Sequence, residues 1–410
     1  MQWAPQLSSA LEVERWERLL RAERSPSFEV AKLASRVPGV RRVLGLPAHL
    51  DTPDDGTLVT REARVAQARS SVIGRLARRF ERERRTAAEP APKRHRPSAF
   101  PPIGPMLDRE IDAAIELLRS VPFEELQLRG WHLQPNHYNC PLNDLRFLRE
   151  HPELWIREVV PAEVEWDFDG QIELLERIAQ HVPELSDVPE RRSAEPGRFC
   201  WDNDASFPRG DAIAYYGIVR QLRPRRVIET GAGWSSLVLA KAVTANERDC
   251  EVTLIDPEPR WEVLGELPAG WRLIESPVQL TDLAEFESLE AGDVLFYDGS
   301  HCVRTAGDVN WIFFEVLPRL SPGVWLHVHD LMWPWDYPAP WVLDEGLSWN
   351  EQYFVQAFLI GNSAYRVRLT VGMVARVRGE EVKALIPDFG GGGSLWIEKL
   401  SGGSAPSGRG

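Results

Sequence analysis

Short apolar runs alternate with longer amphipathic stretches over the second half of the chain. Runs of β-branched or aromatic residues bounded by turn residues predict buried strands, whereas apolar positions three or four apart predict helices. The first strand starts at Val227-Ile228 and leads through a glycine turn into an apolar helix that opens at Ser235-Ser236. This order predicts the nucleotide-binding corner of an α/β sheet. Further strands are predicted at 250–255, 271–275, 293–297, 324–328, 365–370 and 394–398, and helices at 170–181, 211–222, 310–320 and 350–360.

The N-terminal part of the chain has a different pattern. Helical spacing of apolar residues occurs at 8–22, at 28–46 and again at 107–118, and a long basic helix is predicted at 61–85. A Pro/Ala-rich stretch follows the basic helix and has the composition of a linker. We therefore predict four segments: a helical, basic extension with its linker (1–98), a helical or irregular cap region (99–200), the α/β domain (201–400) and a disordered tail (401–410).

Charge is distributed unevenly along the 410 residues. The formal net charge is -13, yet the segment 61–96 holds twelve Lys/Arg against four Asp/Glu, so the rest of the chain carries -21. An acidic chain of this kind is not expected to bind nucleic acid in general. The basic segment 61–96 is a candidate docking surface for a partner, although such a run is more often a solvated face.

Cysteine usage and the N-terminus bear on the compartment. Four widely spaced cysteines form no Cys-x-x-Cys pair, which predicts reduced thiols in a cytoplasmic protein rather than disulfides or a zinc site. Glu12, Glu14 and Glu17 stand where a signal peptide needs an apolar core. No apolar run approaches the roughly 18 residues of a membrane span, so none is expected. The four cysteines are Cys140, Cys200, Cys250 and Cys302.

The glycine corner departs from the dinucleotide fingerprint. Gly231 and Gly233 give Gly-x-Gly, but Ser236 occupies the third glycine position. Glu229, at the end of the strand, would repel a pyrophosphate and suits a cationic or hydroxyl-bearing ligand. A plain turn with a solvated Glu229 is the alternative. Asp256 ends the second strand, where sheets of this type bind ribose hydroxyls.

Several further motifs follow one another along the chain. They are Trp201-Asp202-Asn203, Gly210-Asp211-Ala212, Arg225-Arg226-Val227-Ile228-Glu229, Asp298-Gly299-Ser300-His301, Gly307-Asp308-Val309-Asn310, Leu317-Pro318-Arg319-Leu320, His327-Val328-His329-Asp330, Asp336-Tyr337-Pro338 and Trp349-Asn350-Glu351-Gln352-Tyr353. In this order, the motifs resemble those of the class I S-adenosylmethionine-dependent methyltransferases, and more narrowly of the bacterial methyltransferase family 24, over roughly residues 130–399. The stretch Thr230-Gly231-Ala232-Gly233-Trp234 departs mildly from the family pattern, because similar sequences more often have Val-Gly-Ser-Gly-Phe.

The resemblance implies a Rossmann-like, seven-stranded, mostly parallel sheet with helices on both faces. It also implies S-adenosylmethionine as cofactor. Glu229, Gly231 and Gly233 would then hold the methionine end of the cofactor. Asp256 would bind the ribose, and Val278-Gln279 would flank the adenine.

Two groups of residues compete to assist proton loss from a hydroxyl acceptor. His301 follows the fourth strand on the loop over the crevice and titrates near neutrality, so it is the candidate general base, with Asp298 beside it. Alternatively, Asp298, His329 and Asp330 form a site for Mg²⁺ or Mn²⁺, as in some related natural-product O-methyltransferases. A buried, hydrogen-bonded His329 with a structural role is an equally good interpretation.

The loop after the fifth strand is the most aromatic part of the chain. Trp333, Trp335, Tyr337 and Trp341 are predicted to form a substrate wall, although any one of them could belong to the core.

We expect a sugar, glycan or natural-product hydroxyl as the methyl acceptor. A nicotinamide-dependent oxidoreductase and a non-catalytic adaptor with the same fold are the alternatives; the acid at Glu229 counts against the first.

Overall fold

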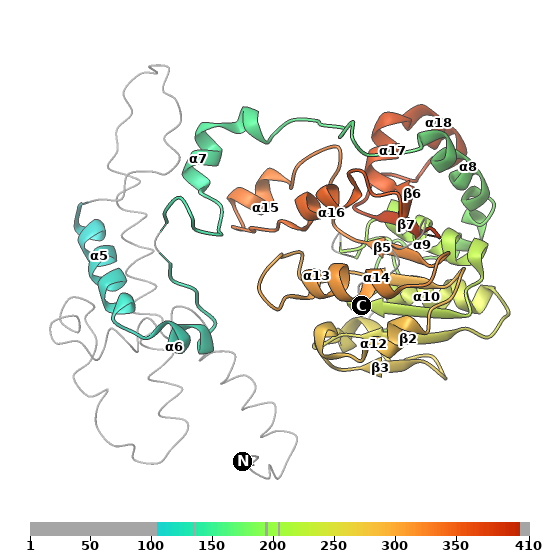
Figure 1. Ribbon diagram of the computed structural model, residues 1–410, viewed down its shortest axis with the longest axis horizontal. Helices are drawn as coiled ribbons and strands as arrows, with labels where there is room; N and C mark the ends of the chain where they lie inside the picture. The colour runs from blue at the N-terminus through green and yellow to red at the C-terminus, as the bar shows by residue number, and fades with distance from the viewer. Residues whose placement is uncertain (1–104, 135, 193–195, 204–205, 402–410) are drawn as a thin grey trace, which may run out of the picture. The chain divides into compact units, whose positions relative to one another are not determined.

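The computed structural model describes residues 105–134, 136–192, 196–203 and 206–401 (Figure 1). The chain divides into two compact units, residues 1–140 and 141–410. In the first unit, the described helices are α5 (Pro105–Arg119), which was predicted, and α6 (Phe123–Leu128). The predicted helices before residue 105, the basic segment 61–96 and nearly all of the predicted tail lie outside the described residues. The division into four segments remains a prediction.

A seven-stranded sheet forms the centre of the second unit, in the order β3-β2-β1-β4-β5-β7-β6. The first five strands pair in parallel, and β7 runs antiparallel to both β5 and β6. The predicted seven-stranded, mostly parallel sheet is therefore confirmed. The strands are β1 (Arg226–Thr230), β2 (Glu251–Ile255), β3 (Arg272–Ile274), β4 (Val294–Tyr297), β5 (Trp325–Val328), β6 (Tyr365–Thr370) and β7 (Leu395–Lys399).

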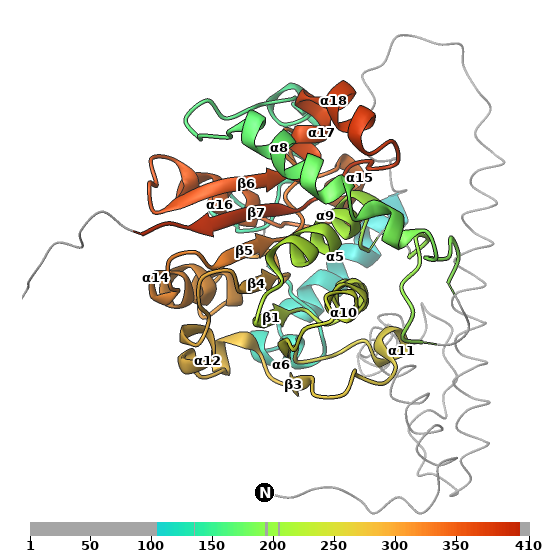
Figure 2. The ribbon, with the colours of Figure 1, turned by 90° about the vertical axis from the view of Figure 1, so that its right-hand side faces the viewer.

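Helices cover both faces of this sheet. Figure 2 shows α9 and α10 on one side of the strands and α12 and α14 on the other. Helices predicted at 170–181, 211–222 and 350–360 correspond to α8, α9 and α16. The predicted helix at 310–320 is α13, a π-helical turn (Ile312–Val316) and α14 in succession. The helices of this unit are α7 (Leu145–Glu150), α8 (Phe168–Ala179), α9 (Arg209–Leu222), α10 (Trp234–Ala245), α11 (Trp261–Leu264), α12 (Leu283–Glu287), α13 (Asp308–Trp311), α14 (Leu317–Arg319), α15 (Ala339–Leu343), α16 (Glu351–Leu359), α17 (Val371–Val377) and α18 (Gly379–Leu385), with 3₁₀ turns η1 (Pro152–Leu154), η2 (Val182–Leu185) and η3 (Val278–Leu280).

Strand residues alternate between two apolar clusters, one on each face. Val294 and Phe296 of β4 lie in the cluster that includes α9 and α10, whereas Leu295 and Tyr297 lie in the cluster that includes α12 and α14. Successive residues of a strand point to opposite faces. Because both faces of β4 are covered, all four of its residues are apolar or aromatic, as expected for a parallel strand inside a layered sheet.

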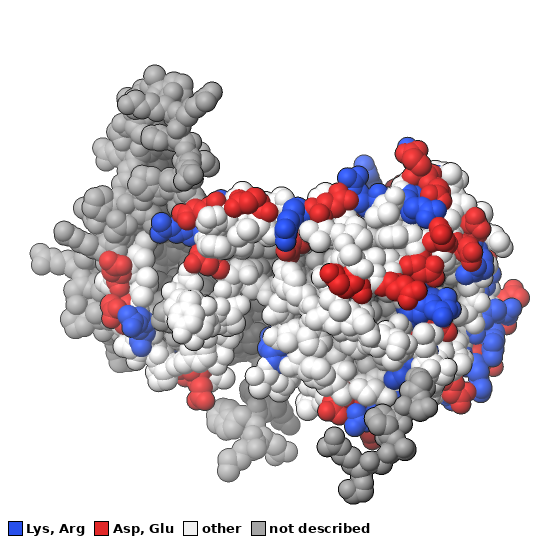
Figure 3. All heavy atoms as spheres, turned by 45° about the horizontal axis from the view of Figure 1, so that its top comes forward, with Lys and Arg blue, Asp and Glu red and all other residues white. Residues whose placement is uncertain are grey.

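The surface of the described residues carries charges of both signs. Figure 3 shows Lys and Arg side chains interspersed with Asp and Glu on the face it draws. Ion pairs among the described residues include that of Arg226 with Glu251, at 2.9 Å. Within the described part of the chain, no helix combines the length and apolar character needed to cross a bilayer.

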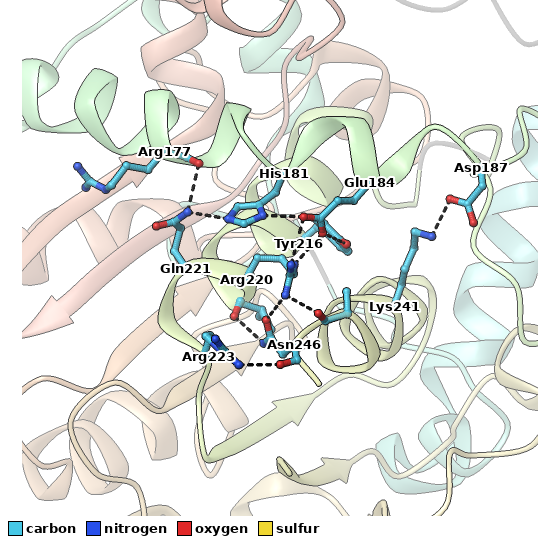
Figure 4. A network of polar contacts seen from close by, with 12 residues as sticks. Arg177, His181, Glu184, Asp187, Tyr216, Arg220, Gln221, Arg223, Lys241 and Asn246 are labelled. Atoms are coloured by element: carbon cyan, nitrogen blue, oxygen red, sulfur yellow. Dashed lines mark hydrogen bonds and ion pairs between the residues drawn. The ribbon is translucent and has the colours of Figure 1, made fainter. Parts of the chain in front are cut away.

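A polar network fastens η2 to the helices on one face of the sheet (Figure 4). Arg220 of α9 donates to both carboxylate oxygens of Glu184, at 2.7 and 3.1 Å, and Tyr216 donates at 2.5 Å. Arg220 also donates to the carbonyl of Ala245 at the end of α10, at 2.7 Å. The bonds from Arg220 lower the pKa of Glu184 to about 2, against the opposing effect of its partial burial. The Glu184 carboxylate thus joins η2 to α9, and the Arg220 guanidinium joins α9 to α10.

We expect Glu184→Gln to lower the free energy of unfolding by about 1–2 kcal/mol near neutral pH, an amount reduced by screening because the side chain is one third exposed. The folded-state pKa lies below the unfolded value of 4.5, so this stabilisation is complete above pH 4.5 and is lost as the pH falls through about 2. Denaturant unfolding of both proteins at several pH values measures the effect. Glu380→Gln serves as control, and a difference that stays constant from pH 7 to pH 3 would contradict the assignment.

Candidate active site

The turn after β1 packs directly against the end of β4. Gly231 has a φ of +86°, and a Cβ atom there would overlap the carbonyl oxygen of Asp298. Its amide donates to the carbonyl of Ile255 at the end of β2, at 3.1 Å, and the Asp298 amide donates to the carbonyl of Thr230 at the same distance. Only glycine satisfies both the left-handed backbone and the close approach. The ends of three strands are therefore held together at this turn.

Glu229 lies behind the turn rather than on an open surface. Its side chain is fully buried and accepts hydrogen bonds from the hydroxyls of Tyr215 at 2.8 Å, Ser235 at 2.8 Å and Ser236 at 2.5 Å. Burial raises the pKa of Glu229 to about 7, although the three hydroxyls act in the opposite direction. The carboxylate thus connects β1 to α9 and to the start of α10, and it fixes the position of the turn from inside.

A cavity of about 990 Å³ opens at the carboxyl ends of the parallel strands. This edge, where β1 and β4 are neighbours although β2 follows β1 in sequence, is the expected ligand crevice of an open α/β sheet. Among the predicted site residues, Glu229 and His329 are absent from the lining, and three of the four predicted wall aromatics are absent as well. The predicted residues that line it are Gly231, Gly233, Asp256, Val278, Gln279, Asp298, His301, Asp330 and Trp341.

Asp256 supports the glycine turn from the second strand. One of its carboxylate oxygens accepts from the amide of Ala232 at 2.7 Å, and the other accepts from the amide of Glu258 at 2.7 Å. Val278 and Gln279 belong to η3, which follows β3 on the same side of the cavity. The predicted ribose and adenine residues therefore lie on one side of the glycine turn.

A cluster of carboxylates and one imidazole forms the other side of the cavity. His301 Nε2 lies 3.4 Å from Asp298 Oδ1 and 3.3 Å from Asp330 Oδ2, while its Nδ1 lies 3.0 Å from Glu351 Oε2. Burial opposes protonation of the imidazole, but Asp298 and Glu351 outweigh it and raise the pKa of His301 to about 10. The ring is therefore a cation at neutral pH and balances part of the charge of the carboxylates.

His329 lies in the interior, in agreement with the interpretation of it as a buried residue. It is buried, with Nε2 3.3 Å from Asp211 Oδ2, and Nδ1 3.4 Å from Asp330 Oδ1 and 3.8 Å from Asp298 Oδ2. Burial disfavours its charged form, yet Asp330 and Asp298 raise the pKa of His329 well above its ordinary value. Of the three residues predicted to bind a metal, Asp298 and Asp330 face the cavity together, and His301 is the imidazole beside them on the cavity wall.

The geometry of Asp298, His301 and Asp330 is compatible with a divalent cation. One ligand atom from each lies within 4.8 Å of the others. Two carboxylate oxygens and one imidazole nitrogen suit Mn²⁺, whereas Mg²⁺ prefers oxygen ligands and retained water. A cation at this position would take the place of the proton on Nε2.

Two buried carboxylates behind the imidazoles were not predicted. Glu351, at the start of α16, faces His301, and Asp211, in the first turn of α9, faces His329. Both residues belong to motifs on which the resemblance to the methyltransferase family rests, so the sequence did indicate that these two segments matter. Nothing in the sequence showed which side chain would meet which imidazole, because the contacts span 50 and 118 positions of the chain.

The aromatic loop after β5 contributes less to the cavity than predicted. Trp333 and Tyr337 lie in the interior, where Trp333 packs against Trp166 at 5.3 Å between ring centroids. Trp335 is partly exposed and lies under Arg376, away from the cavity lining. Trp341 does line the cavity, and Trp349 joins it at 5.4 Å in an edge-to-face arrangement.

We expect Gly231→Ala to lower the free energy of unfolding by about 2–5 kcal/mol, since the new Cβ adds both backbone strain and an overlap with the Asp298 carbonyl. Gly233→Ala is the matched control. Gly233 has an extended φ of -170°, and a Cβ there meets only Arg260 Cδ, at 3.9 Å. Thermal or denaturant unfolding compares the two, and equal stability of both variants would show that the turn tolerates a side chain.

Comparison with known proteins gives matches in sequence and in structure. Residues 228–331 match a family model described as a methyltransferase domain. An uncharacterized protein of Archaeoglobus fulgidus is 32% identical over 167 residues, which cover 38% of this chain and 73% of that protein. The SAH-bound methyltransferase PaMTH1 of Podospora anserina is 14% identical, with 66% of this chain and 100% of that chain covered and a TM-score of 0.30. The structure described as cmcI-D160 Mg-SAM is 17% identical, with 54% and 95% covered and a TM-score of 0.29.

Structural similarities at such identities and TM-scores assign neither an activity nor a metal. The match to the methyltransferase domain is of a different kind, because it begins inside β1, includes the glycine turn and Asp256, and ends just after Asp330. It thus covers the glycine turn and the acids that face the cavity in one segment. The chain belongs to the class I S-adenosylmethionine-dependent methyltransferases.

Proposed function

We propose that this enzyme transfers the methyl group of S-adenosylmethionine to a hydroxyl oxygen of a sugar, glycan or small natural product. The observation that carries the proposal is that the glycine corner and the Asp298–His301–Asp330 cluster line the same cavity. The first provides a place for the methyl donor, and the second provides groups for proton removal. In the reaction the acceptor oxygen forms a bond to the methyl carbon, the sulfonium–methyl bond breaks, and the hydroxyl proton passes to the protein.

Cofactor binding is assigned to the side of the cavity formed by β1, β2 and η3. In the proposal, the turn of Gly231 and Gly233 holds the methionine end, and Asp256 accepts hydrogen bonds from the ribose hydroxyls. Val278 and Gln279 flank the adenine. Glu229, predicted as a direct contact, acts here through the turn that it anchors, because its side chain is fully buried, outside the cavity lining, and enclosed by three hydroxyls.

The acceptor is assigned to the opposite side, beside Trp341 and Trp349. These two side chains offer flat apolar surfaces on which a sugar or aromatic ring can stack. Trp349 also packs on the His301 ring at 4.4 Å between centroids. An acceptor ring held there would place a hydroxyl near the acidic cluster, and positioning of this kind supplies much of the rate enhancement in a direct methyl transfer.

Proton removal is assigned to Asp298 and His301 acting together. The Asp298 side chain is 29% exposed, whereas that of His301 is 8% exposed. The carboxylate is therefore more accessible than the imidazole to an acceptor in the cavity. Because the imidazole is already protonated in this arrangement, we assign the role of base to Asp298 in place of His301, the residue predicted for it, and the imidazolium charge balances the carboxylates around it. Asp298, His301 and Asp330 would also hold a divalent cation, which when bound would lower the pKa of the acceptor hydroxyl.

Titration calorimetry with S-adenosylmethionine, followed by transfer of labelled methyl to sugar and phenolic acceptors, tests the function. We expect tight binding, and turnover with a hydroxylated acceptor that yields S-adenosylhomocysteine. Binding of a nicotinamide dinucleotide in place of S-adenosylmethionine would favour an oxidoreductase. Cofactor binding without turnover on any acceptor would favour the adaptor.

We expect Asp256→Ala to weaken S-adenosylmethionine binding by about 1.5–3 kcal/mol, the range for hydrogen bonds that involve a charged group. Glu258→Ala is the control, because Glu258 is exposed nearby and contributes its backbone amide rather than its side chain. Calorimetry on the two variants measures the difference, and an unchanged affinity in Asp256→Ala would remove this residue from the cofactor site.

We expect methyl transfer to fall after treatment with EDTA and to return with Mn²⁺ or Mg²⁺. Asp298→Asn should bind Mn²⁺ at least tenfold more weakly, because one of three ligands loses its charge. Asp344→Asn, which changes an exposed carboxylate outside the cluster, should behave as the wild type. Full activity in a chelated preparation would show that Asp298 and His301 remove the proton without a cation.

A further inference from the structure

The start of α16 is fastened to the loop that carries His301. The backbone amides of Asn350 and Glu351 both donate to the carbonyl of His301, at 3.0 and 3.2 Å. The Asn350 side chain in turn accepts from the amide of Val303 at 2.6 Å. These contacts join segments fifty positions apart, so the placement of His301 depends on α16 as well as on β4.

The Glu351 side chain reinforces this connection from the interior. It is 1% exposed, and its Oε2 lies 3.0 Å from Nδ1 of His301. The other oxygen, Oε1, is buried without a hydrogen-bond partner among the described residues. Burying a carboxylate with one oxygen unsatisfied costs free energy. That cost is offset by the charge-assisted bond to His301, which is stronger than a bond between neutral groups.

His301 itself has a backbone that needs external support. Its φ of +56° lies in the left-handed region, which costs a non-glycine residue free energy and persists where the surroundings fix it. The three hydrogen bonds from the start of α16 and the packing of Trp349 supply that support. With Nδ1 held by Glu351, the opposite nitrogen Nε2 can only face Asp298 and Asp330.

We propose that Glu351 is a positioning residue that fixes the His301 ring with Nε2 directed at Asp298 and Asp330, and so prepares the cation site. The cation part of this inference rests on the proposed function. A carboxylate that accepts from the remote nitrogen of a metal-binding imidazole fixes the orientation of the ring and raises its basicity. Glu351 lies outside the segment that matches the methyltransferase domain, so this role is supplied by a later part of the chain.

Two substitutions separate the hydrogen bond from the volume of the side chain. Glu351→Leu removes the bond at similar size, and Glu351→Gln keeps an oxygen that can accept from Nδ1. Free Mn²⁺, measured by electron paramagnetic resonance during titration of the full-length protein, gives the affinity. We expect Glu351→Leu to bind Mn²⁺ about 10- to 100-fold more weakly and Glu351→Gln to retain most of the affinity. Wild-type affinity in Glu351→Leu would overturn the proposal.

Gln171→Leu is the control for a general loss of stability, since Gln171 is a buried polar residue that bonds to Thr370 and Trp166 away from the cluster. It should leave the Mn²⁺ affinity unchanged. Crystal structures of both Glu351 variants provide a readout that needs no metal. If the wild-type protein binds no Mn²⁺, the cation part of the proposed function fails. The positioning role is then judged from the crystal structures alone. It is supported if the His301 ring turns in Glu351→Leu and keeps its orientation in Glu351→Gln. A ring that holds its place in both variants overturns the positioning role.

Discussion

The contact between the turn after β1 and the end of β4 is the constraint on which the rest of the site depends. Gly231 lies so close to the Asp298 carbonyl that no side chain fits between them. The same residue, Asp298, begins the acidic side of the cavity. One backbone contact therefore sets the spacing between the groups assigned to the methyl donor and those assigned to the proton. A methyl transfer needs this spacing to be fixed, since misplacement of the reacting atoms is costly in rate.

Charge balance is the second constraint. Asp298, Asp330 and Glu351 surround His301, and Asp298 and Glu351 raise the pKa of the imidazole to about 10 despite its burial. In a medium of low dielectric such a group of acids requires a positive charge, and either a proton on His301 or a bound cation can provide it. The same electrostatic demand thus explains the protonated imidazole and makes the cluster suitable for a divalent ion.

The sequence predicted the sheet and the strand-end residues because these depend on local pattern. The apolar run of β4 and the Gly-x-Gly turn could be recognised without knowing what they contact. The directions of side chains were harder to predict. Glu229 lies near the end of a buried strand as expected, but the hydroxyls of Tyr215 from α9 and of two serines from α10 enclose it. Trp333 and Tyr337 were assigned to the cavity by composition, whereas their burial depends on packing with distant residues such as Trp166. Glu351 could not be assigned a role, because its partner His301 is fifty positions away.

Burial increases stepwise from the cavity into the protein. The side chains of Asp298 and Asp330 are 29% and 21% exposed, that of His301 is 8% exposed, and that of Glu351 is 1% exposed. The exposed members lie within residues 228–331, the segment that matches the methyltransferase domain, whereas Glu351 and Asp211 lie after and before it. The matched segment thus provides the carboxylates that line the cavity, and the flanking segments provide the buried carboxylates that contact the imidazoles. Because those carboxylates belong to α9 and α16, the geometry of the site depends on these two helices as well as on the matched segment.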